Sequence, residues 1–222
     1  MGELFLIRHG QASYGSAEYD QLSALGEQQA RWLGEYFRKR GAMPARIVIG
    51  TQNRHRQTFE ALAGGMGRAL LAERDERWNE IDFQALVDAF ARQHPQEGRY
   101  SAGEPKSFFK AMRRALLAWS EGRIEGELPE SWEQFRERVS RALRDIQNDS
   151  GSVFVVSSSG AIAAALMHIM QFPARTHVDL YLQARNTGFS ECFFNAATLR
   201  VTAMNQTPHL DMPERRASLT FI

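Results

Sequence analysis

The sequence predicts an α/β protein: a three-layer α/β/α sandwich around a mostly parallel sheet, with an antiparallel edge and a helical insertion. Short apolar runs at 4–7, 46–49 and 152–156 are typical of strands buried on both faces. Segments with helical periodicity follow these runs, which is the alternation expected of a parallel sheet covered on both sides. A long stretch at 84–146 has helical periods and no strand pattern.

The first half of the chain is expected to alternate strands and helices. A helix is predicted over 23–40, because apolar side chains recur there at helical spacing, Ser23 can cap its first turn and Gly41 can end it. The further elements expected in this half are a strand at 46–49, a helix at 52–63 and a third short apolar piece at 70–72.

The middle of the chain is predicted to be helical. Apolar side chains define one helix face between Phe108 and Trp119 and another between Phe135 and Ile146. The second of these helices has a plausible capping box in Ser131 and Gln134, and a loop rich in turn residues covers 98–105. We interpret about 84–130 as a helical insertion that overhangs the sheet, within a single domain spanning 1–222.

The last third returns to strands. The strand at 152–156 is followed by a small polar loop and an apolar helix that runs through Met170. Three later segments, 178–183, 188–194 and 198–204, also resemble strands. Short turns join them, so at least the last two are expected to be antiparallel at one edge of the sheet.

Composition excludes two classes of partner. The chain has 222 residues with 27 Lys plus Arg and 26 Asp plus Glu, whereas binders of nucleic acid or of membrane surfaces carry a concentrated basic excess. Cys192 is the only cysteine, which fits a reducing compartment. The apolar run at 4–7 is too short for a signal peptide or a membrane span. We therefore expect a cytoplasmic protein with neither nucleic acid nor membrane as a partner.

Polar side chains follow several predicted strands, at the sheet edge where open α/β proteins bind ligands. The first group is Arg8, His9 and Gly10, directly after the strand at 4–7. A histidine here can be a nucleophile if a backbone carbonyl holds its other ring nitrogen, and the fork of Arg8 matches phosphate oxygens. Gly10 permits an unusual backbone angle or close approach of a ligand. A structural histidine beside a solvated arginine explains the group equally well.

The second group lies at the start of the helix at 52–63, where N–H groups and the helix dipole favour an anion. Arg54 falls in the first turn, where a cation opposes the dipole at a cost of up to about 1 kcal/mol, which favours a functional role. His55 and Arg56 are slightly better explained as a solvated, basic helix start.

Two more groups are candidates. Glu80 and Asp82 lie between Trp78 and Phe83, and an apolar setting raises a carboxyl pKa, as suits a general acid. An ordinary surface loop explains Asp82 better and Glu80 equally well. The polar loop at 157–160 can hold an anion with backbone amides and hydroxyls, although capping of the following helix is the simpler explanation.

In this order the groups resemble the motifs of the histidine phosphatase superfamily, the phosphoglycerate mutase-like proteins. Residues 4–10 are similar to its N-terminal signature, and residues 54–58 to its Arg-Ala-x-Gln-Thr motif, while Glu80 falls where the family places its proton donor. The other similar segments are 22–30, 186–188 and 205–210. The resemblance therefore runs from Leu4 to Leu210, nearly the whole chain.

The resemblance implies a three-layer fold with helices above the site, and it implies roles for the matched residues. His9 would accept the phosphoryl group, Arg8 and Arg54 would clamp the phosphate, and Glu80 would act first as acid and then as base. Neither a metal nor another cofactor is implied.

Two positions depart from the family pattern. Ser158 stands where the family's Val-Ser-His-Gly element has its histidine, and Gln11 stands where many members carry Glu. We assign both, with Gly10, to the substrate-binding set. A hydroxyl still donates one hydrogen bond but brings no positive charge, and loss of one donor in a preorganised site lowers turnover by about 10²–10³.

The expected function is hydrolysis of a phosphate monoester, on a small molecule or a phosphoprotein, through a phosphohistidine on His9 and at a rate that Ser158 reduces. The alternative is a catalytically weak phospho-ligand-binding or regulatory protein. A phosphomutase is the least favoured, because it must keep its phosphohistidine from water. Trp78, Phe83 and Tyr100 are candidates for the pocket wall, with core packing as the preferred explanation of each.

Overall fold

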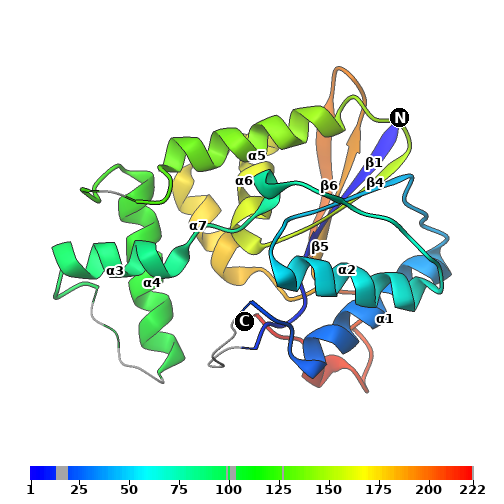
Figure 1. Ribbon diagram of the computed structural model, residues 1–222, viewed down its shortest axis with the longest axis horizontal. Helices are drawn as coiled ribbons and strands as arrows, with labels where there is room; N and C mark the ends of the chain where they lie inside the picture. Colours follow the sequence, from blue (N-terminus) through cyan, green and yellow to red (C-terminus); the bar gives the residue numbers. More distant parts are fainter. Residues whose placement is uncertain (14–19, 99, 101–103, 127, 222) are drawn as a thin grey trace.

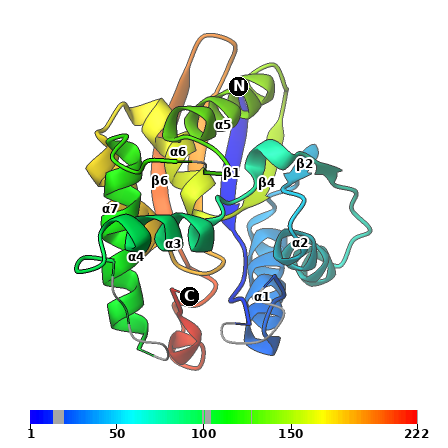
Figure 2. The same ribbon diagram turned by 60° about the vertical axis from the view of Figure 1, so that its left-hand side comes forward.

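The computed structural model describes residues 1–13, 20–98, 100, 104–126 and 128–221. Within these residues it confirms the predicted fold class: one mixed sheet is covered by helices on both faces (Figures 1 and 2). The strands are β1 (Gly2–Arg8), β2 (Arg46–Ile49), β3 (Glu73–Arg74), β4 (Ser152–Ser157), β5 (Phe189–Phe194) and β6 (Leu199–Gln206). The α-helices are α1 (Ala24–Arg40), α2 (Asn53–Met66), α3 (Phe83–Gln93), α4 (Pro105–Ser120), α5 (Trp132–Ile146), α6 (Ser159–Met170) and α7 (Ala174–Gln183).

The described strands follow the order β3-β2-β4-β1-β5-β6 across the sheet. The first four of these are parallel, with Leu6 of β1 opposite Val155 of β4 at the centre. Strand β5 pairs antiparallel with β1 and β6 pairs antiparallel with β5, which makes the antiparallel edge. The carboxyl ends of β1, β2 and β4 therefore meet along one edge, and His9, Arg54 and Ser158 follow these three strands, whereas Glu80 follows β3.

Both faces of the sheet are buried, and alternate residues of each strand serve opposite faces. Phe5 and Ile7 pack in a cluster with α1 and α2, whereas Leu4 and Leu6 pack in a larger cluster with α3 to α7. Successive side chains of a strand point to opposite faces, so a strand that is covered twice must be apolar throughout. This explains why the predicted strands were continuous apolar runs.

The predicted helix boundaries are confirmed where the sequence supplies caps. The Ser23 side chain accepts a hydrogen bond from the Gly26 N–H at the start of α1, and Gly41 ends this helix with a φ of 72°. Ser131 and Gln134 form the predicted capping box of α5. Helix α2 continues to Met66, beyond the predicted end at 63.

One prediction of local structure was wrong. The segment 178–183 is the second half of α7 and not a strand. Its apolar residues fit both periods, and the packing of α7 against α6 buries Val178 and Tyr181 at helical spacing. The short apolar piece at 70–72 directly precedes the short strand β3, which begins at Glu73 and pairs with β2.

Helices α3 and α4 occupy the region predicted to be a helical insertion, and they pack against each other, with α4 also against α7 (Figure 2). Four residues of the predicted loop at 98–105 lie outside the described residues. The division into one domain with an insertion at about 84–130 stays a prediction. None of the helices in the described part of the chain combines the length and apolar character needed to cross a bilayer.

Candidate active site

The backbone of His9 is held at the centre of the sheet, one residue beyond β1. Its N–H donates to the carbonyl of Ser157 at 2.9 Å, and its carbonyl accepts from the Thr187 N–H at 3.2 Å. The first bond ties His9 to the end of β4, and the second ties it to the turn before β5. The side chain is 4% exposed, so the imidazole is fixed in a largely dry setting.

The His9 ring is in the form that a nucleophile requires. Its Nδ1 lies 2.7 Å from the carbonyl oxygen of Gly10, and a carbonyl only accepts, so Nδ1 carries the proton and Nε2 keeps a lone pair. Burial, with the positive charges of Arg54 and Arg8 and the nearby His55 ring, holds the pKa of His9 well below its ordinary value. The imidazole is therefore neutral at physiological pH, and the Gly10 carbonyl is the backbone partner that the sequence-based argument for a nucleophile required.

His9 lies in a pocket of about 530 Å³. Arg8, Arg54 and Glu80, all predicted from the sequence, also line it, together with Ser159. The remaining lining residues are apolar or aromatic and come from α3, α4, α7 and the C-terminal segment: Phe83, Phe108, Phe109, Met112, Tyr181, Leu182 and Phe221. The pocket thus joins a polar floor to an apolar wall, and Phe83 is the predicted wall candidate that it includes.

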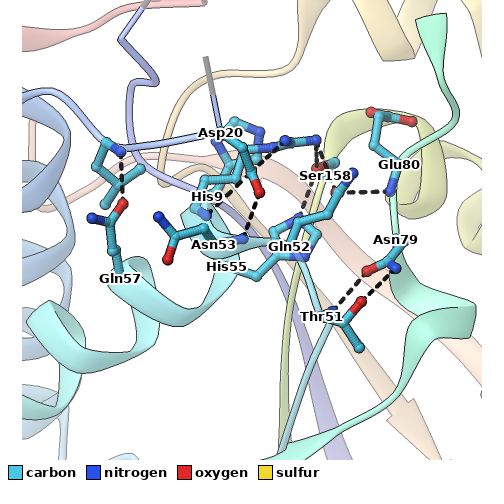
Figure 3. Close-up of polar contacts among 12 residues, drawn as sticks. His9, Asp20, Thr51, Gln52, Asn53, His55, Gln57, Asn79, Glu80 and Ser158 are labelled. Carbon is cyan, nitrogen blue, oxygen red and sulfur yellow. Dashed lines mark hydrogen bonds and ion pairs between the residues drawn. The ribbon is translucent and has the colours of Figure 1, made fainter. Parts of the chain in front are cut away.

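Arg54 is buried at the start of α2 and already has acceptors. Its Nη1 donates to Oδ1 of Asp20 at 2.7 Å, and its Nη2 donates to Oε1 of Gln52 at 2.8 Å. Oδ2 of Asp20 also accepts from the Asn53 N–H at 2.7 Å (Figure 3). A carboxylate thus lies at the N-terminus of this helix, the place where N–H groups and the helix dipole favour an anion.

Arg8 is bound to main-chain oxygens. Its Nη1 donates to the carbonyls of Ala184 and Phe221, the latter at 2.8 Å. These bonds link the end of β1 to the segment after α7 and to the C-terminal segment. Arg8 remains a lining residue of the pocket, so its guanidinium is within the site even with these partners.

Glu80 caps helix α6 across the sheet edge. Its Oε2 accepts from the Gly160 N–H at 3.0 Å, and its Oε1 accepts from the Ile81 N–H at 3.0 Å. Burial raises the pKa of this carboxyl, whereas the two N–H donors and Arg54 act in the opposite direction. A buried carboxyl with a raised pKa can donate a proton near neutrality and accept one afterwards.

Ser158 lies with Arg54 and His55, and its hydroxyl does not face its own helix. Its Oγ is 2.8 Å from Nε2 of His55 and 3.4 Å from Nη2 of Arg54, and the residue is 1% exposed. Figure 3 shows Ser158 between His9 and Glu80 in projection, beside the ring of His55.

Gly10 and Gln11 serve the packing of α1 in the structure. A Cβ on Gly10 would lie 2.3 Å from the carbonyl oxygen of Gly26, so the glycine lets the loop approach the helix backbone. The side chain of Gln11 accepts from Oγ of Ser23 at 2.8 Å. Neither residue is among those that line the pocket, and their substrate-binding roles stay predictions.

Sequence reasoning missed three residues around the site. His55, interpreted as part of a solvated helix start, is 0% exposed, whereas its neighbour Arg56 is partly exposed, as expected, and pairs with Glu60. Gln52 accepts from Arg54 and from the Glu80 N–H. Asp20 and Gln52 gave no signal in the sequence, because only the folded chain brings them to Arg54.

The other candidates have structural roles. Asp82 caps α3 by accepting from the Ala85 N–H at 2.9 Å. Trp78 is fully buried in the core, and the ring of Tyr100 packs edge-on against Phe108, with centroids 5.2 Å apart. Among the residues that the structure describes, no three histidine, cysteine or carboxylate side chains converge as metal ligands would.

The fold and these side chains define a class of α/β protein that presents a neutral histidine, two arginines and a buried carboxyl at the carboxyl ends of its central strands. The chain belongs to the histidine phosphatase superfamily, branch 1, whose family model matches residues 4–207.

Solved structures with the same fold include several phosphatases. A proposed alpha-ribazole-5′-phosphate phosphatase from Escherichia coli has a TM-score of 0.69 at 17% identity, over 93% of this chain and 97% of that one. A mycobacterial glucosyl-3-phosphoglycerate phosphatase has a TM-score of 0.62 at 22% identity, over 93% and 100%. A mutant phosphoserine phosphatase from Entamoeba histolytica, in complex with phosphoserine, has a TM-score of 0.66 at 19% identity, over 95% and 100%. No curated protein matched the sequence.

Proposed function

We propose that this chain is a phosphatase that hydrolyses a phosphate monoester through a phosphohistidine on His9. One observation carries the proposal: the His9 ring donates from Nδ1 to the Gly10 carbonyl and keeps a lone pair on Nε2, in a pocket that Arg8 and Arg54 also line. Membership of the histidine phosphatase superfamily and the phosphatases among the structural neighbours support hydrolysis as the reaction class.

In the first step, Nε2 of His9 attacks phosphorus and the bond from phosphorus to the ester oxygen breaks. Glu80, whose pKa burial raises above its ordinary value, gives a proton to the departing oxygen. Arg8 and Arg54 donate hydrogen bonds to phosphoryl oxygens, and the hydroxyl of Ser158 donates a hydrogen bond to another. Positioning and charge neutralisation then supply most of the rate acceleration.

In the second step, a water molecule attacks the phosphorus of the phosphohistidine. The Glu80 carboxylate takes a proton from this water, and the phosphorus–nitrogen bond breaks. Inorganic phosphate leaves, His9 returns to its neutral form and Glu80 is again protonated. The two steps together consume one ester and one water and release one alcohol and one phosphate.

The pocket wall supports an apolar or aromatic alcohol as the leaving group. The lining side chains beyond the polar floor are aromatic or aliphatic, led by Phe83, Phe108 and Phe109. Burial of apolar surface contributes about 25 cal/mol per Å², so an aryl or alkyl group gains affinity here. A sugar or a carboxylate would lose hydrogen bonds to water without replacement.

The test is hydrolysis of p-nitrophenyl phosphate by the wild type and by His9→Ala, with His168→Ala as a control, because that residue is outside the pocket. We expect turnover in the wild type and in the control, and none above background in His9→Ala. Equal rates in the wild type and in His9→Ala would rule out the proposal. Phosphate binding without turnover would instead support the alternative of a phospho-ligand-binding protein.

A further inference from the structure

His55 is a buried histidine that the reaction described above does not use. It is the third residue of α2, its side chain is 0% exposed, and its ring centroid lies 5.8 Å from that of His9. Its Nε2 lies 2.8 Å from Oγ of Ser158. Figure 3 shows the ring pointing from the start of α2 toward Ser158.

Ser158 is placed to cap a helix but does not do so. It is the N-cap residue of α6, and its side chain makes no capping hydrogen bond, although serine is among the preferred capping residues. The carboxylate of Glu80 accepts from the Gly160 N–H instead. The Ser158 hydroxyl is thereby released to face His55 and Arg54.

The protons around Ser158 can be assigned. Nδ1 of His55 is buried and has no hydrogen-bond partner in the described part of the chain, and a buried N–H without an acceptor is rarer than an unpaired lone pair. The ring proton therefore belongs on Nε2, which donates to Oγ of Ser158. Burial and the charge of Arg54 hold the pKa of His55 well below its ordinary value, so the ring carries only this proton.

With these hydrogen bonds in place, the hydroxyl of Ser158 can act toward a further group only as a donor. A serine oxygen has two lone pairs and one proton. His55 donates to one lone pair, and Nη2 of Arg54, at 3.4 Å, approaches the other. The hydroxyl proton is left to donate to a third group.

We propose that His55 is a positioning residue for the phosphatase reaction: its Nε2–H fixes Ser158 Oγ so that the Ser158 hydroxyl donates to an oxygen of the phosphoryl group bound at His9. This inference rests on the proposed function and adds a residue to it. The phosphoryl group gains a neutral donor whose direction is set before substrate binds, which is the arrangement that stabilises developing charge without reorganisation.

Two variants of similar size isolate the donor. The amide Nε2 of His55→Gln can replace the ring N–H, whereas His55→Met has no donor. We expect His55→Met to lower kcat for p-nitrophenyl phosphate by about 10–100-fold with little change in KM, and His55→Gln to keep most of the wild-type kcat. In a Ser158→Ala background the two variants should have the same kcat, because the hydroxyl that His55 orients is gone. Equal kcat values for Gln and Met with Ser158 present, or a difference that persists in Ser158→Ala, would overturn the inference.

Binding separates this inference from the proposed function. Calorimetry with inorganic phosphate and with vanadate measures the affinity for an anion that the Ser158 hydroxyl contacts, and it does not depend on turnover. A wild type that lacks turnover would end the phosphatase proposal, yet weaker vanadate binding by His55→Met than by His55→Gln would still support the positioning role. Equal binding of both anions by the two variants would overturn it.

Discussion

The carboxylate of Asp20 accepts a hydrogen bond at 2.7 Å from Nη1 of Arg54, the arginine that we propose to hold the phosphoryl group. Its other oxygen accepts from the Asn53 N–H at 2.7 Å. Asp20 thus binds the donors at the start of α2 as an oxyanion would. A phosphate ester must either displace this carboxylate or bind beside it.

Asp20→Asn should therefore bind phosphate more tightly. The amide keeps an acceptor for Arg54 but removes a negative charge from the site, and repulsion between like charges at this range is on the order of 1 kcal/mol or more. We expect the inhibition constant of inorganic phosphate to fall by about tenfold. Glu60→Gln is the matched control, since it removes the same charge further along α2. An unchanged constant in Asp20→Asn would show that Asp20 does not compete with phosphate.

Glu80→Gln should lower kcat/KM most for substrates with poor leaving groups. A phenolate needs protonation as it departs more than a nitrophenolate does, and a general acid contributes about 10²–10⁴ to the rate. The value of kcat/KM, which reports phosphoryl transfer to His9, should fall by about 10² or more for phenyl phosphate and by much less for p-nitrophenyl phosphate. Equal losses for the two esters would argue against Glu80 as the acid of this step.

Ser158→His should lower activity in the presence of His55. Ser158 is 1% exposed and the His55 ring lies against its hydroxyl, so a second imidazole has no room. The double variant His55→Ala, Ser158→His provides that room and should recover more activity than either single variant. Higher kcat for Ser158→His alone than for the wild type would contradict this account of the packing.

Buried neutral histidines should make the protein sensitive to acid. Burial lowers the pKa of His177 to about 4 and that of His209 to about 3, from an ordinary value of 6.5. Between the ordinary pKa of 6.5 and the lowered pKa of each buried histidine, the unfolded chain binds more protons than the folded one. The free energy of unfolding therefore falls as pH falls below 6.5. The loss at pH 5 is about 2 kcal/mol for each histidine.

Urea unfolding between about pH 5 and 7.5, a range that spans the titration of histidine in the unfolded chain, checks this expectation. His177→Phe retains a ring against Trp132, whose centroid lies 4.8 Å away, but cannot titrate. Its stability should fall less steeply with acid than that of the wild type. Parallel slopes for the two proteins would show that His177 is not held neutral by burial.

Local signals predicted much of the fold because they agreed with the tertiary structure. Ser23 and Gly41 bound α1 in the structure, and the apolar runs became strands that are buried on both faces. The prediction of a strand at 178–183 was wrong, because the apolar pattern of this segment fits both a strand and a helix. Only the packing of α7 against α6 decides between them.

The site was predictable where a side chain follows its own strand or opens its own helix. His9, Arg54 and Glu80 line one pocket, and the roles that the resemblance implies for them stay proposals. His55 was misjudged, because the sequence does not reveal that the third residue of α2 faces Ser158. Asp20 could not be found at all, since its role depends on the path of a loop and not on its neighbours in sequence.

The central claim is that His9 carries the phosphoryl group, and trapping of that group tests it most directly. Wild type and Glu80→Gln would be mixed with p-nitrophenyl phosphate and quenched in alkali, where phosphohistidine survives, and the peptides would be read by mass spectrometry. We predict a phosphoryl group on Nε2 of His9, enriched in Glu80→Gln because its hydrolysis step is slow, and absent from His9→Ala. Turnover with no phosphoryl group on His9, or with one on another residue, would contradict the account.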